Sequence, residues 1–251
     1  MKMNGAVVKR ICIVSIVCIM VYGAWRGYAL HRNSDALWNI VSRQCVPHQQ
    51  QQHSPTPCQQ VNLSQGYVLL KDKVGIAQYL LIPTAQVSGI ESDKLLDPTT
   101  PNYFSLAWSL MPRVSQRLEK PIPNTLLSLA INSKWGRSQN QLHIHLSCLR
   151  GDVRQRLAEK QSTLNEQWQR LSLLNHPYWV RTLTLEQLDA RSLFLRVFTE
   201  LPDIDPGSGR EGIAVTMLAD GRLVVLVLRT DWVKGILGSA EELQDHQCDA
   251  V

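Results

Sequence analysis

The stretch from Leu142 to Cys148 constrains the fold more than any other part of this 251-residue chain. Apolar and polar side chains alternate along it, which is typical of a β-strand with one buried face. Because successive side chains on a strand point to opposite faces, His143 and His145 share one face with Ser147, and the apolar residues share the other. The pattern therefore predicts two imidazoles side by side on an accessible face of a sheet.

Two imidazoles at this spacing suit two kinds of chemistry. One can be a nucleophile with the other beside it, or both can be metal ligands. The preceding residues favour the nucleophile, because an apolar run from Leu126 to Ile131 ends at Asn132 and a short polar connection follows, as in a β-hairpin. The connection carries small and polar residues that can place donors near an anion, namely Gly136, Ser138 and Asn140.

This segment resembles the signature of the histidine-triad superfamily of nucleotide hydrolases and transferases. The signature has three alternating histidines preceded by Asn or Gln and by Gly-x-Ser/Thr, and it is matched here by Asn132, Gly136, Ser138, His143 and His145. The resemblance implies that His143 is the nucleophile, assisted by His145, and that Asn132, Gly136 and Ser138 belong to the substrate site. The first histidine is replaced by Gln141. Its main-chain carbonyl can still orient the nucleophile, so we place Gln141 among the substrate-binding residues.

A second hairpin is predicted upstream, from Tyr67 to Asp72 and from Gln78 to Pro83. It resembles the earlier hairpin of the superfamily, in which an acidic residue binds the ribose hydroxyls, and Asp72 matches that position. A solvated turn aspartate is the alternative. Basic residues on the loops around the site are Lys71, Lys73, Lys134 and Arg137. We expect two of them, Lys71 and Arg137, to hold a pyrophosphate.

Over its whole length, the chain resembles the family of bacterial CDP-diacylglycerol pyrophosphatases. The stretches that carry this resemblance are the Gln-rich loop between Cys45 and Cys58, Leu70 to Asp72, Leu96 to Asn102, Ser128 to Val153, and Ser239 to Cys248. The resemblance implies hydrolysis of CDP-diacylglycerol to CMP and phosphatidate. We expect a covalent nucleotidyl-histidine intermediate on His143, with neither a cofactor nor a metal.

The N-terminus indicates a membrane segment. Basic residues precede an apolar run from Ile11 to Trp25, which is typical of a segment with a cytoplasmic N-terminus. Continued to Leu30, the run approaches the ~20 residues that a spanning helix needs. We therefore expect residues 1–32 to be a single-pass inner-membrane anchor and residues 33–251 to be a periplasmic catalytic domain with a C-terminal extension. A cleaved signal peptide is the alternative.

Cysteine use agrees with export. Four of the six cysteines lie outside the apolar segment, and an even set suggests two disulfides in an extracytoplasmic chain. Sequence alone permits three pairings, of which we favour Cys45 with Cys58 and Cys148 with Cys248. Metal ligation by thiolates fits poorly, because the chain has no Cys-x-x-Cys spacing.

The fold class that we predict is α+β, with an antiparallel sheet of histidine-triad type and flanking helices. Helices are predicted over residues 101–110, 152–173, 184–201 and 239–246, the last three from capping-box patterns. Asp220-Gly221 predicts a late hairpin, and we expect loops over 173–181 and 202–211. Helical aromatic residues usually pack inward, so core positions are expected for Tyr103, Phe104 and Trp108, with membrane contact as the alternative.

The formal net charge of +5 comes from scattered basic residues and does not indicate a nucleic-acid partner. The partners we expect are CDP-diacylglycerol in the membrane and water, and a homodimer is left open. One alternative function is a broader nucleotide pyrophosphatase or CMP transferase of the same mechanism. A second is a metal-dependent protein in which His143 and His145 are joined by His176 or His246. A third is a non-catalytic module that binds lipid headgroups.

Overall fold

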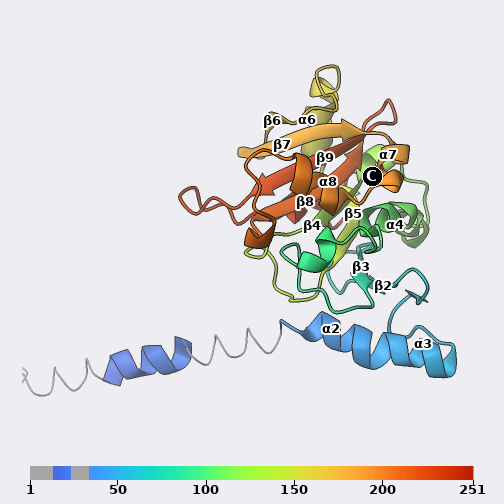
Figure 1. Ribbon diagram of the computed structural model, residues 1–251, viewed down its shortest axis with the longest axis vertical. Coiled ribbons are helices and arrows are strands. Elements are labelled where there is room, and N and C mark those ends of the chain that lie inside the picture. The colour runs from blue at the N-terminus through green and yellow to red at the C-terminus, as the bar shows by residue number, and fades with distance from the viewer. Residues whose placement is uncertain (1–13, 24–33, 251) are drawn as a thin grey trace, which may run out of the picture.

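The computed structural model describes residues 14–23 and 34–250 (Figure 1). Residues 14–23 are helical and exposed. Within the described residues, no helix has both the length and the apolar character needed to cross a bilayer. The rest of the expected anchor over residues 1–32 lies outside the described residues, so the membrane segment stays a prediction.

An antiparallel ten-stranded sheet forms the centre of the domain. Its strands are β1 (Gln60–Asn62), β2 (Tyr67–Lys71), β3 (Tyr79–Pro83), β4 (Leu127–Ile131), β5 (Ile144–Leu149), β6 (Gln169–Leu173), β7 (His176–Leu183), β8 (Glu211–Met217), β9 (Leu223–Arg229) and β10 (Gln244–Asp245). Their order is β1-β2-β3-β5-β4-β8-β9-β7-β6, and β10 pairs with the end of β5. The sheet confirms the α+β class and the predicted hairpins β2–β3, β4–β5 and β8–β9.

Helices cover both faces of this sheet. The described α-helices are α2 (Ala36–Ile40), α3 (Val46–Gln52), α4 (Tyr103–Ser109), α5 (Pro112–Arg117), α6 (Gly151–Lys160), α7 (Leu185–Ala190) and α8 (Leu193–Glu200), with a π-helical turn (Val41–Cys45) joining α2 to α3. In Figure 1, α2 and α3 lie beside β2, at the opposite end of the domain from β6 and β7.

The two faces of the sheet bury separate groups of apolar side chains. On one face a single large core packs the apolar residues of β5, such as Ile144 and Leu146, against α4, α5, α7 and α8. On the other face there are two smaller cores. One lies under α6 and the C-terminal segment (residues 239–250), and the other lies under α2. His145 lies between these two smaller cores, because its strand neighbours are Ala130 on one side and Leu80 on the other.

Both favoured disulfide pairings are confirmed. Cys45, in the π-helical turn between α2 and α3, bonds to Cys58, which lies just before β1. This disulfide ties the helical segment to the start of the sheet. Cys148 bonds to Cys248 and fixes the C-terminal segment to β5. The aromatic residues of α4 are also buried as expected, with exposed fractions of 9 % or less for Tyr103, Phe104 and Trp108.

Several predicted elements are wrong at their ends. The helix expected over 152–173 stops at Lys160, and residues 169–173 form β6 instead. The expected loop over 173–181 is the β6–β7 hairpin, whose turn places Leu174 and Asn175 at positive φ. The loop was predicted because Asn and Pro residues, which are typical of turns, lie near the start of β7. They outweighed the strand pattern that follows them.

The two later helices differ as well. Residues 184–201 form α7 and α8, separated where Arg191 adopts an extended backbone, although the predicted capping box at Thr184 is present. Residues 239–246 form a 3-10 turn (Ala240–Leu243) followed by β10. The extended end is favoured there because its backbone groups pair with β5.

Candidate active site

A cavity of about 550 Å³ opens on the histidine side of the sheet. Its walls come from α2, from the turn after β2, from the loop between β4 and β5, and from the C-terminal segment. The predicted site residues that line it are Lys71, Asp72, Asn132, Gly136, Arg137, Ser138, His143 and His145. The structure therefore brings together residues from separate parts of the chain.

His143 and His145 lie on one face of the strand, as the alternation predicts, with ring centroids 4.9 Å apart. The expectation of an accessible face is wrong in degree, because only 7 % of His143 and 6 % of His145 is exposed. The turn after β2 and the C-terminal segment cover the face that the strand pattern left open. The imidazoles thus meet a partly desolvated cavity rather than bulk water.

The orientation of His143 is fixed by the chain just before β5. Its Nδ1 lies 2.7 Å from the carbonyl oxygen of Gln141, and because a carbonyl can only accept, Nδ1 carries the proton. The neutral ring then has its lone pair on Nε2. Burial, followed by the charge of nearby His145, lowers the pKa of His143 to about 4. His143 is therefore a neutral imidazole at physiological pH, with the electronic form that a nucleophile needs.

The side chain of Gln141 plays a different part from the one expected. It is fully buried, lies outside the cavity, and donates through Nε2 to the carbonyls of Pro83 and Ala85. Its Oε1 accepts from the backbone of Val87. We therefore correct its assignment as a substrate-binding residue: Gln141 connects β5 to the segment after β3, and only its carbonyl serves the site.

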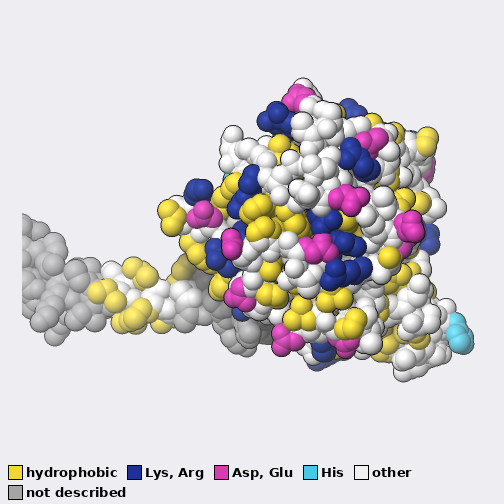
Figure 2. Space-filling view, turned by 45° about the horizontal axis from the view of Figure 1, so that its top comes forward, with side chains coloured by type: hydrophobic (Ala, Val, Ile, Leu, Met, Phe, Trp, Pro, Cys, Tyr) yellow, Lys and Arg dark blue, Asp and Glu magenta, His cyan; other side chains and the backbone are white. Residues whose placement is uncertain are grey.

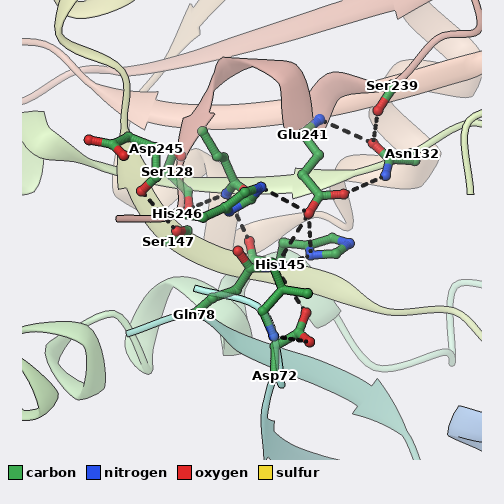
Figure 3. A network of polar contacts seen from close by, with 12 residues as sticks. Asp72, Gln78, Ser128, Asn132, His145, Ser147, Ser239, Glu241, Asp245 and His246 are labelled. Atoms are coloured by element: carbon green, nitrogen blue, oxygen red, sulfur yellow. Dashed lines mark hydrogen bonds and ion pairs between the residues drawn. The ribbon is translucent and has the colours of Figure 1, made fainter. Parts of the chain in front are cut away.

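His145 has partners from distant parts of the chain (Figure 3). Its Nδ1 lies 3.0 Å from Gln78 Nε2 and 3.2 Å from Glu241 Oε1. Burial lowers the pKa of His145, while Glu241 and Asp72 act in the opposite direction. When Nδ1 of the neutral ring accepts from Gln78, the proton lies on Nε2. This buried Nε2 has no hydrogen-bond partner among the described residues, so it can donate to a bound oxygen.

Glu241 is the main site residue that sequence reasoning missed. Its Oε2 accepts from Asn132 Nδ2 at 2.9 Å, and its Oε1 lies 3.3 Å from His246 Nε2. Burial alone would raise its pKa, but His145, Asn132 and His246 outweigh burial and lower it. Glu241 is therefore a buried carboxylate beside His145. The favoured pairing of Cys148 with Cys248 was a signal, because it brings this segment close to β5.

The acidic residue of the first hairpin occupies the cavity wall as predicted. Asp72 Oδ2 accepts from Gln78 Nε2 at 2.9 Å, and Oδ1 accepts from the backbone of Val74 at 3.1 Å. The turn rests on the C-terminal segment, since the Ile76 N–H donates to the carbonyl of His246. Asp72 thus has one carboxylate oxygen in the network around His145.

The two expected pyrophosphate ligands are already engaged. Lys71 Nζ donates to the carbonyls of Asp72 and Gly75, and burial lowers its pKa. Arg137 makes a two-pronged ion pair with Glu91, at 2.6 and 2.7 Å. Lys71 and Arg137 both line the cavity. The buried Nε of Arg137 lacks a partner among the described residues. Phosphate binding by these residues stays a prediction.

The other candidate ligands are placed as follows. Ser138 is an exposed residue at the cavity wall. Gly136 lies so close to the C-terminal segment that a Cβ would come within 3.2 Å of the Leu237 carbonyl and of Ser239. His176 is bound to Glu242, away from the cavity. In the described part of the chain, no three His, Cys, Asp or Glu residues are arranged to hold a metal ion.

Fold and site together define an α+β protein with an oriented, neutral histidine and a second histidine at the floor of one cavity. The CDP-diacylglycerol pyrophosphatase family matches residues 32–251. A curated CDP-diacylglycerol pyrophosphatase of Yersinia pestis is 41 % identical over 252 residues, covering 99 % of this chain and 98 % of that protein. The chain belongs to the CDP-diacylglycerol pyrophosphatase family.

Among solved structures, a DUF4931 family protein from Bacillus cereus is similar, with a TM-score of 0.41 and 12 % identity. The alignment covers 77 % of this chain and 94 % of that one.

Proposed function

We propose that this cavity hydrolyses CDP-diacylglycerol, the reaction for which the family is named, through a covalent intermediate on His143 in a site of histidine-triad type. The observation that carries the mechanism is the 2.7 Å bond from His143 Nδ1 to the Gln141 carbonyl. It leaves Nε2 as the nucleophile and will stabilise positive charge on the ring when Nε2 forms a bond.

In the first step, His143 Nε2 attacks the phosphorus of the CMP moiety. A nitrogen–phosphorus bond forms, and the bond from that phosphorus to the bridging oxygen breaks. Phosphatidate leaves with the bonding electrons, and as a phosphomonoester with a second pKa near ~6 it is a stable anion. The proton on Nδ1 remains directed at the Gln141 carbonyl throughout.

His145 acts on the oxygens around this phosphorus. Its Nε2–H donates to the bridging or a non-bridging oxygen as negative charge moves there, and donors placed for developing charge commonly contribute a few kcal/mol. Glu241 also favours the positive charge that the His143 ring gains when Nε2 bonds to phosphorus, since its carboxylate acts to raise the pKa of His143. Gln78 and Glu241 together hold the His145 ring in place.

In the second step, water attacks the same phosphorus and the nitrogen–phosphorus bond breaks. CMP is released, and the proton lost by water passes to solvent or to a phosphate oxygen. Asp72 binds the ribose hydroxyls in this scheme, and Ser138 and the loop around Gly136 bind the phosphate nearest the cytidine. Lys71 and Arg137 contribute positive charge to the cavity wall.

The setting of this reaction is also part of the proposal. An N-terminal anchor over residues 1–32 would keep the enzyme on the inner membrane, with the catalytic domain in the periplasm, where disulfides persist. CDP-diacylglycerol keeps its acyl chains in the bilayer, so an anchored enzyme searches for it in two dimensions. A homodimer is compatible with this scheme and is tested by the mass of the purified protein in detergent.

The test uses the full chain in detergent micelles with CDP-diacylglycerol and excess chelator. We expect CMP release by the native chain, a cytidylyl adduct on His143 detectable by mass spectrometry, and a loss of about 10³-fold or more in His143→Ala. His176→Ala is the matched control, because it removes a histidine outside the cavity. Both variants are checked by thermal unfolding.

Two outcomes would contradict the mechanism. Loss of activity in chelator with recovery on adding zinc would make the histidines metal ligands. Full activity of His143→Ala would remove the nucleophile from this position. Equal rates on CDP-diacylglycerol and on soluble CDP-alcohols or dinucleotides would instead favour the broader pyrophosphatase.

A further inference from the structure

Two loops beside the cavity expose large apolar side chains. Trp135 belongs to the loop between β4 and β5, and Trp232, Val233 and Leu237 belong to the loop after β9. Their exposed fractions are 47 %, 58 %, 98 % and 46 %, respectively. The rings of Trp135 and Trp232 are in edge contact, with centroids 5.1 Å apart. We call these four residues the tryptophan face.

The loop after β9 holds its apolar tip in a defined shape. Asp231 and Ile236 form a two-residue bridge, with backbone bonds of 2.8 and 2.9 Å. Asp231 Oδ1 accepts from the backbone of Val233 and Lys234, and Gly235 completes the turn at positive φ. The exposed tip is therefore ordered before it meets a partner, which lowers the entropy lost on docking.

Basic groups surround the tryptophan face. Lys134 lies with its ammonium 5.6 Å from the ring of Trp135, and Lys234 is exposed at the tip, near Asp231. A neighbouring cavity of about 540 Å³ is lined by Lys234 and by three arginines, Arg170, Arg210 and Arg229. In Figure 1 the loop after β9 projects at the left of the domain, and Figure 2 shows hydrophobic, basic and acidic side chains at the same edge.

This composition selects one kind of partner. Tryptophan side chains favour the boundary between lipid and water, where the ring meets hydrocarbon and the N–H remains wet. Lysine and arginine side chains beside them match the negative headgroups of anionic lipids. An acidic protein would complement the charges but would not require a valine with 98 % of its surface exposed at the tip.

The tryptophan face also adjoins the catalytic cavity. Trp135 and Gly136 line the cavity wall, and Gly136 contacts the backbone at Leu237. We infer that the tryptophan face docks on the surface of an anionic bilayer, so that the cavity receives its lipid substrate directly from the membrane. This inference rests on the proposed function for its substrate, but docking itself is independent of catalysis.

The first measurement reads docking without catalysis. The full-length His143→Ala chain is mixed with anionic phospholipid vesicles with and without brominated acyl chains, which quench nearby tryptophan. We expect the emission lost to bromine to fall when Trp232→Phe is added. Adding Trp168→Phe, which removes a partly buried tryptophan packed on the core, should leave that loss unchanged. An unchanged loss in Trp232→Phe would overturn the proposal.

The second measurement separates docking from chemistry. Full-length native chain and Trp232→Glu/Val233→Glu are compared on CDP-diacylglycerol in anionic vesicles and on a short-chain, water-soluble CDP-diacylglycerol. We expect kcat/KM to fall about tenfold or more on vesicles only. Leu185→Glu, an exposed leucine on α7, is the matched control and should behave as the native chain.

Two other outcomes would also overturn the proposal, and a third would separate it from the proposed function. Equal losses on both substrates would assign the two residues to the cavity and overturn the proposal. A native dimer that becomes monomeric in the double variant would show that a second copy covers the face, which also overturns it. If the native chain cleaves neither substrate, the proposed function fails, while the bromine measurement still decides docking.

Discussion

His143 and His145 lie two residues apart on the same face, yet their surroundings are built in different ways. His143 is oriented by the carbonyl of Gln141, within the same stretch of chain. His145 is oriented by Gln78, which precedes β3, and by Glu241, which precedes β10. The orientation of His143 therefore depends on local backbone geometry, whereas that of His145 depends on tertiary structure.

This difference predicts which changes the orientation of each histidine tolerates. A change that leaves the backbone from Gln141 to His143 intact should spare the orientation of His143. Displacing the C-terminal segment should disturb His145 first, because β10 and the Cys148–Cys248 disulfide hold that segment against β5.

The largest effect is expected from removing that disulfide. Cys148→Ser/Cys248→Ser opens a link between residues 100 apart in sequence, which lowers the free energy of unfolding by about 5 kcal/mol in the chain-entropy account. CMP release should fall as well, since Glu241 loses its fixed position. Denaturant unfolding and rate measurements check both effects.

The matched control removes the other disulfide, Cys45–Cys58, which spans 13 residues. In the same account its loss costs about 3 kcal/mol. A larger loss of stability from this shorter link would contradict the prediction.

The next effect is expected from Glu241→Gln, which keeps the shape of the side chain but removes its charge. We expect kcat to fall about 10- to 100-fold with little change in KM, because the positive charge that the His143 ring gains in the first step loses this nearby negative charge. The acid limb of the pH profile should move to lower pH, since Glu241 acts to raise the pKa of His143.

Glu242→Gln is the control for this position. Glu242 is adjacent in sequence, but its side chain accepts from Tyr178 and contacts His176 instead of reaching the cavity. Its replacement should change kcat less than about threefold. Equal losses from both variants would assign Glu241 a general structural role.

A smaller and different effect is expected from Gln141→Ala. The carbonyl that orients His143 remains, so kcat should change less than about threefold. The free energy of unfolding should fall by about 2 kcal/mol, because buried backbone groups of Pro83, Ala85 and Val87 lose their partner. A large loss of kcat in a stably folded variant would show that the side chain itself serves the reaction.

The last prediction concerns pH, and its effect on activity is the smallest of the series. With a pKa of about 4, His143 stays neutral in acid where an ordinary histidine would be protonated. Between about pH 6.5 and 4 the unfolded chain binds a proton at this residue that the native chain does not, so the free energy of unfolding falls as pH decreases through this window.

Activity should follow the native pKa. At pH 5.5 the contribution of His143 to kcat/KM should decline by less than about twofold, against about tenfold for a histidine with a pKa near 6.5. Rates on a soluble substrate measure this. In His143→Gln the free energy of unfolding should depend less on pH over the same window. An acid limb centred near 6.5 would contradict the assignment.

The sequence predicted what depends on short-range pattern. Alternation placed His145 of β5 and His143, just before β5, on the same side of the sheet, and the two hairpins that carry Asp72 and Asn132 formed where expected. The orienting carbonyl of Gln141 was implied by the resemblance to the histidine-triad signature. These features are local because a strand sets side-chain direction residue by residue.

The features that the sequence did not reveal depend on contacts between distant segments. Glu241 belongs to a stretch that was expected to be helical. It lies in a 3-10 turn, and the pairing of the following β10 with β5 holds that turn at the cavity. The engagement of Arg137 by Glu91 similarly requires the loop after β3 to fold over the site. A capping-box pattern carries no information about either contact.

The position of Glu241 in the chain also sets an order in time. It is synthesised roughly a hundred residues after His143, which at 5 to 20 residues per second takes about 5 to 20 s. During that interval β5 can pair with β3 and β4, but the histidine pair lacks its carboxylate and the cavity lacks one wall. The competent site is therefore a late product of folding, completed after the sheet that carries it.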